Sequence, residues 1–244
     1  MLAIAHRGYS SLYPENTALA FEKAIEAGTD YIETDLRFSS DGMVVCCHDD
    51  NFKRLGGGPV QVDQLPFEDI QKIKFPDGLE ILSLEDVFRI AVGRAKVMLD
   101  VKIPTIAMAK RALEIADFMG MAADIMVGAR TPEMAQFIKQ LRPAANVLAM
   151  PKNDTDLQTF LSLPVDAIRL YEDALEPPSI AAIRAADYPL WVTGGRRTEG
   201  EESGHMTSER LDRLDILDAA AVLVNDPTLI TERRTHKKQP IKVP

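Results

Sequence analysis

Short apolar segments alternate with longer amphipathic segments along nearly the whole chain of 244 residues. Several of the apolar segments are apolar throughout, which is typical of parallel strands that are covered on both faces. The expected strands are Leu2–His6, Asp30–Asp35, Lys96–Val101, Asp124–Val127, Asn146–Ala149, Ala167–Leu170, Leu190–Thr193 and Ala221–Val224. The expected helices lie near Asn16–Ala27, Leu84–Val92, Ile106–Met119, Pro132–Leu141, Asp154–Leu163, Pro178–Ala186 and Ser208–Asp218. This alternation predicts an α/β fold, most economically a TIM-type (β/α)8 barrel.

The length of the chain fits one barrel, since such barrels commonly form a single domain of about 250 residues. We therefore expect one domain over residues 1–244, with a small insertion at about 49–82 and a basic C-terminal tail at 233–244. An open, doubly wound sheet is the alternative, but no Gly-x-Gly-x-x-Gly follows the first strand. Thr131-Pro132 and Asp226-Pro227 have the form of a helix N-cap followed by proline.

One segment interrupts the alternation of strands and helices. Val44–His48 follows the second strand after a four-residue loop that contains Asp-Gly. This loop is too short for a parallel crossover and favours an antiparallel hairpin. If Phe38 pairs with Met43, Asp35 faces Cys46, and His48 lies beside Glu33. The expected fold is therefore a barrel with a short hairpin and an insertion after its second strand.

Composition narrows the possible partners and location. Hydrophobic residues make up 46% of the chain, yet no apolar run approaches the ~20 residues that cross a bilayer. The N-terminus lacks the basic region of a signal peptide, and the only two cysteines, Cys46 and Cys47, are adjacent, so a reducing cytoplasm is expected. A net charge of −9 argues against nucleic acid and against an anionic membrane surface as partners. A small anionic substrate would need local positive charge.

Residues that carry chemistry gather in the first 49 positions. They form the motifs His6-Arg7-Gly8, Pro14-Glu15-Asn16-Thr17, Glu33-Thr34-Asp35 and His48-Asp49. Most of them lie at the ends of apolar runs, where a barrel exposes its loops to solvent. Two imidazoles, two carboxylates and a guanidinium predict a site that binds a phosphate together with a divalent cation.

The four motifs follow one another in this order, and Asp41-Gly42 lies between Glu33-Thr34-Asp35 and His48-Asp49. This ordered set resembles the glycerophosphodiester phosphodiesterase family. The similarity continues through Gly56–Val60, Leu99-Asp100-Val101-Lys102, Trp191 and Asn225-Asp226-Pro227. It therefore spans nearly the whole chain. The resemblance implies a TIM-type barrel and metal-dependent cleavage of glycerophosphodiesters to an sn-glycerol phosphate and an alcohol.

Glu33, Asp35 and Asp100 are the expected ligands of one divalent cation, Mg²⁺ or Ca²⁺, because these ions prefer carboxylate oxygens. The family usually carries Glu at the position of Asp100, so here a shorter side chain has to reach the ion, or a water has to bridge. A solvated hairpin face is the alternative for Glu33 and Asp35, although burying paired acids without a cation is costly.

His6 and His48 are the expected general acid and base, in either order, and Arg7 and Lys102 the expected phosphate-binding residues. Structural alternatives exist: a histidine at a strand end is often only hydrogen-bonded, and Lys102 could be a surface residue.

Other residues are weaker candidates. Glu15 could orient Arg7 without touching substrate, and Asn16 could cap the first helix. Trp191 matches a family position and could line the substrate pocket. Pocket candidates after other strands are Arg130, Arg169 and Tyr171, with His205 at the end of the loop that spans residues 194–204.

Three other functions remain possible from the sequence. A phospholipase C-like lyase would release a cyclic phosphate, and a zinc hydrolase would use His6 and His48 as metal ligands. A barrel that only binds a phosphorylated ligand is the third. Neither the headgroup of the substrate nor the oligomeric state follows from the sequence.

Overall fold

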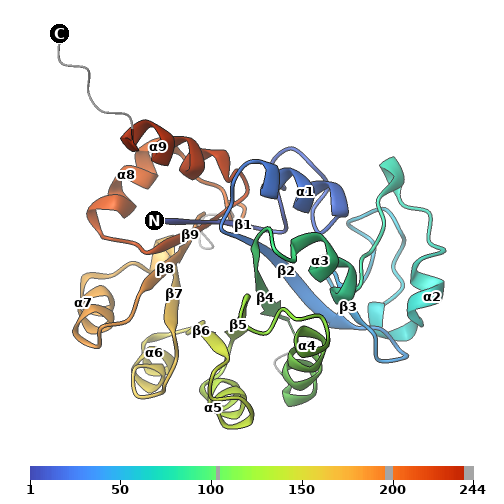
Figure 1. The fold of residues 1–244 in the computed structure, drawn as a ribbon, viewed down its shortest axis with the longest axis horizontal. Helices are drawn as coiled ribbons and strands as arrows, with labels where there is room; N and C mark the ends of the chain where they lie inside the picture. Colours follow the sequence, from blue (N-terminus) through green and yellow to red (C-terminus); the bar gives the residue numbers. More distant parts are fainter. Residues whose placement is uncertain (103–104, 196–199, 239–244) are drawn as a thin grey trace.

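Parallel strands surrounded by helices form a closed barrel in the computed structural model, which describes residues 1–102, 105–195 and 200–238 (Figure 1). The barrel strands are β1 (Leu2–Ala5), β2 (Tyr31–Phe38), β4 (Lys96–Val101), β5 (Ile125–Ala129), β6 (Asn146–Ala149), β7 (Ala167–Tyr171), β8 (Leu190–Thr193) and β9 (Ala221–Val224). Each pairs with the next in parallel, and pairing of β1 with both β2 and β9 closes the barrel. The predicted TIM-type barrel is confirmed.

Helices between the strands form the outer ring (Figure 1). They are α1 (Ala18–Glu26), α3 (Leu84–Ala91), α4 (Ile106–Phe118), α5 (Pro132–Leu141), α6 (Asp154–Phe160), α7 (Pro177–Ala185), α8 (Ser208–Ile216) and α9 (Thr228–Lys238). Most begin at a side chain that accepts a hydrogen bond from a backbone N–H of the first turn. At α1 this residue is Thr17, whose Oγ1 accepts from Ala20 N, so of the two roles considered for Asn16 the helix cap is not the one that the structure has.

The predicted hairpin is present, but its register differs by one residue. β3 (Val44–Cys46) pairs antiparallel with β2, and Phe38 faces Val44 instead of Met43. Ser39 N donates to Met43 O and Gly42 N to Ser39 O, both at 3.0 Å, and Gly42 has a φ of +80°. A three-residue loop that ends in a left-handed glycine therefore replaces the expected four-residue loop.

The changed register alters what lies beside the acidic residues of β2. Cys47, instead of Cys46, faces Asp35, and its N–H donates to Asp35 O. His48 lies beyond the end of β3, so strand pairing does not bring it beside Glu33. Instead Nε and Nη2 of Arg37 both donate to His48 O, at 3.0 and 2.7 Å.

Residues 49–82 form an excursion at the side of the barrel next to β3, with one short α-helix, α2 (Phe67–Ile70), and two 3-10 helices, Val62–Gln64 and Pro76–Gly78 (Figure 1). A separate apolar cluster holds this segment together, made of Val45, Cys47, Phe52, Val62, Ile70, Phe75 and Ile81.

At the C-terminus, α9 extends to Lys238, so residues 233–238 of the expected tail are helical and residues 239–244 lie outside the described residues. Arg234 fastens α9 to the start of the chain by donating to Met1 O and pairing with Asp30.

Interior side chains of the barrel stack in layers of four from alternate strands, as the strand registers require. The lower two layers are apolar or aromatic and comprise Tyr31, Met126, Ala167 and Ala221, then Ile4, Met98, Leu148 and Trp191. The next three layers comprise Glu33, Gly128, Arg169 and Leu223, then His6, Asp100, Met150 and Thr193, then Asp35, Arg130, Tyr171 and Asn225. Polar groups therefore replace the apolar filling toward the C-terminal ends of the strands.

Within the described ranges, none of the helices has the length and apolar character needed to cross a bilayer.

Candidate active site

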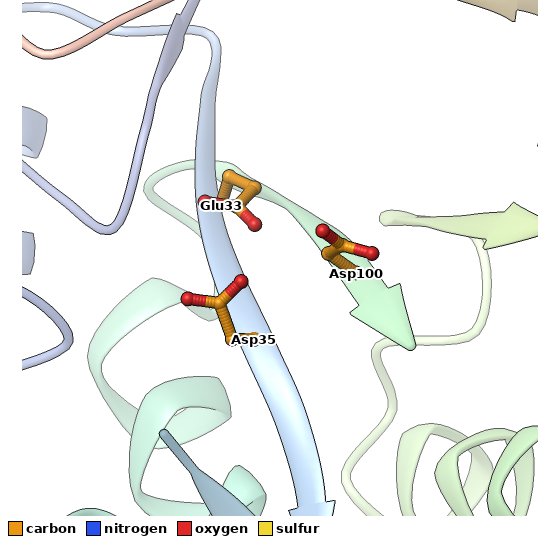
Figure 2. A group of neighbouring side chains, drawn as sticks. All are labelled: Glu33, Asp35 and Asp100. Carbon is orange, nitrogen blue, oxygen red and sulfur yellow. The ribbon is translucent and has the colours of Figure 1, made fainter. Parts of the chain in front are cut away.

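Three acidic side chains converge at the C-terminal mouth of the barrel. Glu33 and Asp35 lie two residues apart on one face of β2, and Asp100 on β4 is in register with Asp35. Figure 2 shows their carboxylates directed toward one another, and one oxygen of each lies within 4.8 Å of the others. All three are buried, with exposed fractions of 1%, 0% and 7% in the order given.

The chemistry of this cluster fits a divalent cation. Burial raises the pKa of Glu33 well above its ordinary value, and the charges of Asp35 and Asp100 raise it further. The chain's own cations therefore leave the negative charge at Glu33 poorly compensated. Three buried carboxylates with one uncompensated charge are the donor set that Mg²⁺ or Ca²⁺ takes.

Positive side chains hold the other two carboxylates in their charged forms. Lys102 Nζ lies 2.7 Å from Asp35 Oδ1 and 2.7 Å from Asp100 Oδ2. Arg130 donates to both oxygens of Asp100, at 3.0 and 2.6 Å, and Arg7 Nε is 3.2 Å from Asp35 Oδ2. Burial would raise the pKa of Asp35 and of Asp100, but these cations outweigh it and lower both.

His6 follows β1 and is held in one orientation. Its Nδ1 lies 2.7 Å from Asn225 Oδ1, so the neutral ring donates its Nδ1–H to this amide oxygen and keeps a lone pair on Nε2. Burial and then the neighbouring charge of Arg7 lower the pKa of His6 to about 4. His6 is therefore neutral at pH 7 and able to accept a proton.

The loop after β8 packs against this hydrogen bond through Gly204. Gly204 has a φ of +84°, and an added Cβ would overlap Asn225 Oδ1 and lie 2.7 Å from His6 Nδ1. Gly204 N donates to Gly194 O and its carbonyl accepts from Asn225 N, at 2.8 and 2.7 Å. Only glycine fits here. The side chain of His205 is half exposed and does not line the pocket.

His48 has an acidic partner. Its Nδ1 lies 2.7 Å from Asp49 Oδ1, while Asp49 Oδ2 accepts from Arg54 Nε at 2.6 Å. Burial and then the charge of Lys102 lower the pKa of His48 below its usual value. About a third of the side chain is exposed, so His48 lies nearer to solvent than His6.

Arg54 of the insertion also fixes the opposite side of the site. Its two Nη atoms donate to both oxygens of Glu15, at 2.8 and 2.7 Å, and Glu15 in turn accepts from Arg7 Nη1 at 2.9 Å. Asn16 lies close by and donates to Asp35 Oδ2 at 3.0 Å. The insertion thus connects the groups that orient His48 and Arg7.

The structure brings most of the predicted site residues to one pocket. It is lined by the predicted residues His6, Arg7, Glu33, His48, Asp100 and Lys102, by the pocket candidates Arg169 and Tyr171, and also by Met98, Met150, Thr193, Ser203 and Leu223. Trp191 does not line this pocket. It is 4% exposed, lies in an apolar layer beneath the site and packs edge-to-face on Tyr31, with the ring centroids 5.4 Å apart.

Sequence reasoning missed two groups that complete the site. Asn225 was noted only as part of a closing motif, and its partner His6 is 219 residues away. Arg54 stands in the insertion, where no pattern separates it from a solvated arginine. The one available signal for Asn225 is its position directly after an apolar strand, where the layers of a barrel place side chains at the mouth.

Comparisons with known proteins agree with this geometry. The family model of the glycerophosphoryl diester phosphodiesterase family matches residues 6–158, more than half of the chain. A glycerophosphodiester phosphodiesterase of Caldanaerobacter subterraneus is 38% identical over 109 residues, which are 42% of this chain and 44% of that protein. The matches to the first curated relatives therefore span less than half of those proteins.

Solved structures share the fold over nearly its full length. A glycerophosphodiester phosphodiesterase from Agrobacterium tumefaciens has a TM-score of 0.77 at 22% identity, covering 95% of this chain and 99% of that one. An Oleispira antarctica phosphodiesterase in complex with the product sn-glycerol-3-phosphate has a TM-score of 0.81 at 17% identity, covering 96% and 97%. With a family match over more than half its length, the chain belongs to the glycerophosphoryl diester phosphodiesterase family.

Proposed function

We propose that this protein is a metal-dependent glycerophosphodiester phosphodiesterase that hydrolyses its substrate to an sn-glycerol phosphate and an alcohol. The observation that carries the proposal is the convergence of His6 and His48 on a pocket that is also lined by Glu33 and Asp100 of the three-carboxylate cluster. The family match and the product bound to the Oleispira antarctica relative support the same substrate class.

In this proposal Arg7 and Lys102 bind the phosphate oxygens, the first with a fork of N–H donors and the second as a point charge. Glu33, Asp35 and Asp100 would hold one Mg²⁺ or Ca²⁺. When bound, this ion polarises the phosphoryl oxygens and stabilises the charge that develops on them.

The two histidines divide the proton transfers. His6 has a free Nε2 and a pKa of about 4, so it suits the role of base and accepts the proton of the attacking water or glycerol hydroxyl. His48 lies nearer to solvent, and the carboxylate of Asp49 on its Nδ1 partly offsets the lowering of its pKa by burial and by the charge of Lys102. Of the two histidines, we therefore assign His48 as the acid that protonates the oxygen of the leaving alcohol.

A panel of glycerophosphodiesters, assayed with chelator and with added Mg²⁺, Ca²⁺ or Mn²⁺, tests the proposal. We expect turnover to need a cation, and His6→Ala and His48→Ala to lower kcat by about 10²–10⁴-fold each. His205→Ala is the matched control and retains wild-type turnover, because this exposed histidine lies outside the pocket. Full activity of either His6→Ala or His48→Ala would contradict the assignment.

Phosphorus NMR of the product separates hydrolysis from the lyase alternative. We expect an open-chain glycerol phosphate, whereas a stable cyclic phosphate would identify attack by the neighbouring hydroxyl without later hydrolysis.

A cytoplasmic location and a single domain over residues 1–244 are further parts of this proposal. The two free, buried cysteines, Cys46 and Cys47, support the former.

A further inference from the structure

Arg169 is a buried guanidinium on the wall of the pocket opposite the carboxylates of β2. It is 5% exposed, comes from β7, and lines the same pocket as His6 and Lys102. Followed round the barrel in both directions, the strand registers put Arg169 in the layer of Glu33 and directly across the barrel from it.

The charge of Arg169 has no acidic partner among residues 1–102, 105–195 and 200–238. Its Nη1 donates to Thr193 Oγ1 at 3.2 Å, and its guanidinium carbon lies 4.3 Å from the ring centroid of Tyr171. Its Nε is buried without any hydrogen-bond partner. Burying an uncompensated charge is costly, so an arginine kept in this state indicates an anion that arrives with the ligand.

Four other cations around the mouth differ from Arg169 in having an acidic partner. Arg7 pairs with Glu15 and Asp35, and Lys102 pairs with Asp35 and Asp100. Arg130 pairs with Asp100, and Arg210 with Glu172 and Glu201. Each of these four cations has at least one carboxylate partner, whereas Arg169 has none within the described ranges.

The surroundings of Arg169 strengthen its attraction for an anion. Its neighbours in the layer are Gly128 and Leu223, and Met98 and Met150 line the same pocket. In a buried site a charge-assisted hydrogen bond is stronger than it is in water. Arg7 and Lys102, which would serve the diester phosphate, come from the opposite side of the barrel beside β2, so Arg169 is free for a second group.

We propose that Arg169 and Thr193 form a second oxyanion subsite, and that the preferred substrate carries a carboxylate on one of its two alcohols in addition to the diester. One guanidinium and one neutral hydroxyl balance a single negative charge, which fits a carboxylate better than a doubly charged phosphate monoester. The diester phosphate, which is also singly charged, is assigned to Arg7 and Lys102. The planar fork of arginine matches the two carboxylate oxygens. The diester half of this substrate rests on the function proposed above.

Binding of two matched probes tests the subsite without turnover. Glycerol 3-phosphate and 3-phosphoglycerate differ only in that a carboxylate replaces the terminal hydroxymethyl group. Titration calorimetry in the presence of Mg²⁺ is expected to show that the wild type binds 3-phosphoglycerate at least tenfold more tightly. Arg169→Gln is expected to remove this preference while changing the affinity for glycerol 3-phosphate less than twofold.

Two further variants complete the design. Arg169→Lys keeps the charge but not the fork, and we expect it to retain part of the preference. Arg184→Gln, which removes an exposed guanidinium on α7 that donates to Leu217 O, should retain all of it. If Arg169→Gln does not fold, the wild type and Arg169→Lys still decide the question.

Equal binding of the two probes by the wild type would overturn the subsite. So would a preference that survives in Arg169→Gln, or an equal loss of affinity for both probes, which would assign Arg169 to the phosphate instead. A protein that shows the preference but hydrolyses no glycerophosphodiester would refute the proposed function and leave the subsite standing.

Discussion

Replacing Gly204 by alanine tests whether the hydrogen bond between His6 and Asn225 orients the proposed base. An alanine Cβ at this position would overlap Asn225 Oδ1 and crowd His6 Nδ1. The loop offers a matched control, because Gly200 also has a positive φ, +70°, but an added Cβ there meets no atom of the described residues within 4 Å. Both substitutions therefore impose backbone strain, and only one disturbs the histidine.

The expected effects follow from these two costs. A left-handed alanine costs about 1–2 kcal/mol, so Gly200→Ala should lower the free energy of unfolding by about that much. A buried hydrogen bond left unmade costs about a further 1–3 kcal/mol, and Gly204→Ala should bear both costs. If the hydrogen bond also holds His6 in the reactive orientation, kcat should fall by about 5- to 150-fold in Gly204→Ala alone.

Two measurements on both variants decide the matter. Urea unfolding reports the free energy of unfolding, and enzymatic detection of released glycerol phosphate reports kcat for a glycerophosphodiester with saturating cation. Equal stability and equal turnover of the two alanine variants would refute the claim that Gly204 is required to leave room for the His6–Asn225 contact.

Three further predictions concern protonation. Asn225→Asp puts a negative charge beside His6 and should raise its pKa from about 4. The acid limb of the pH profile of kcat/KM should therefore move to higher pH, and an unchanged profile would exclude His6 as the base. Burial raises the pKa of Cys47 to about 12, so native protein at pH 8 should not react with a thiol reagent until it unfolds, and prompt labelling would contradict the buried position. Burial would raise the pKa of Glu15, but Arg54 and then Arg7 outweigh it and lower the pKa. The stabilisation from the Glu15–Arg54 ion pair is therefore present above the ordinary carboxylate pKa of about 4 and is lost at lower pH. Arg54→Gln should be about 1 kcal/mol less stable than wild type at pH 7 and closer to it at pH 3. A difference in unfolding free energy that does not depend on pH would disprove this role of the ion pair.

The fold follows from the sequence because its signals are local and repeated. Strands such as Lys96–Val101 and Asn146–Ala149 are bounded as predicted, since continuous apolar runs have clear ends. Convergence of the acidic residues also follows, because parallel strands of a barrel end at one mouth. Glu33 and Asp100 could therefore be placed together before any coordinates were known.

Features that depend on one backbone angle or on distant contacts could not be derived in this way. The left-handed Gly42 shortens the hairpin loop by one residue, and this single angle changes which cysteine faces Asp35. Neither the partner of His6 nor the depth of Trp191 is encoded near those residues. Both depend on how the strands are staggered around the closed sheet.

The staggered layers of the barrel have a consequence for how this protein could acquire new substrates. Arg169 and Glu33 belong to the same stack of side chains as Met98 and Trp191 below them, so the floor of the pocket is also part of the packed interior. A mutation that reshapes this floor changes core volume as well as recognition, and misfitted volume in a core costs about 1–3 kcal/mol. Substitutions that change substrate specificity should therefore occur first in the loops at the mouth of the barrel. They should reach the buried layers beneath the pocket only in proteins whose free energy of unfolding is well above the minimum needed to stay folded.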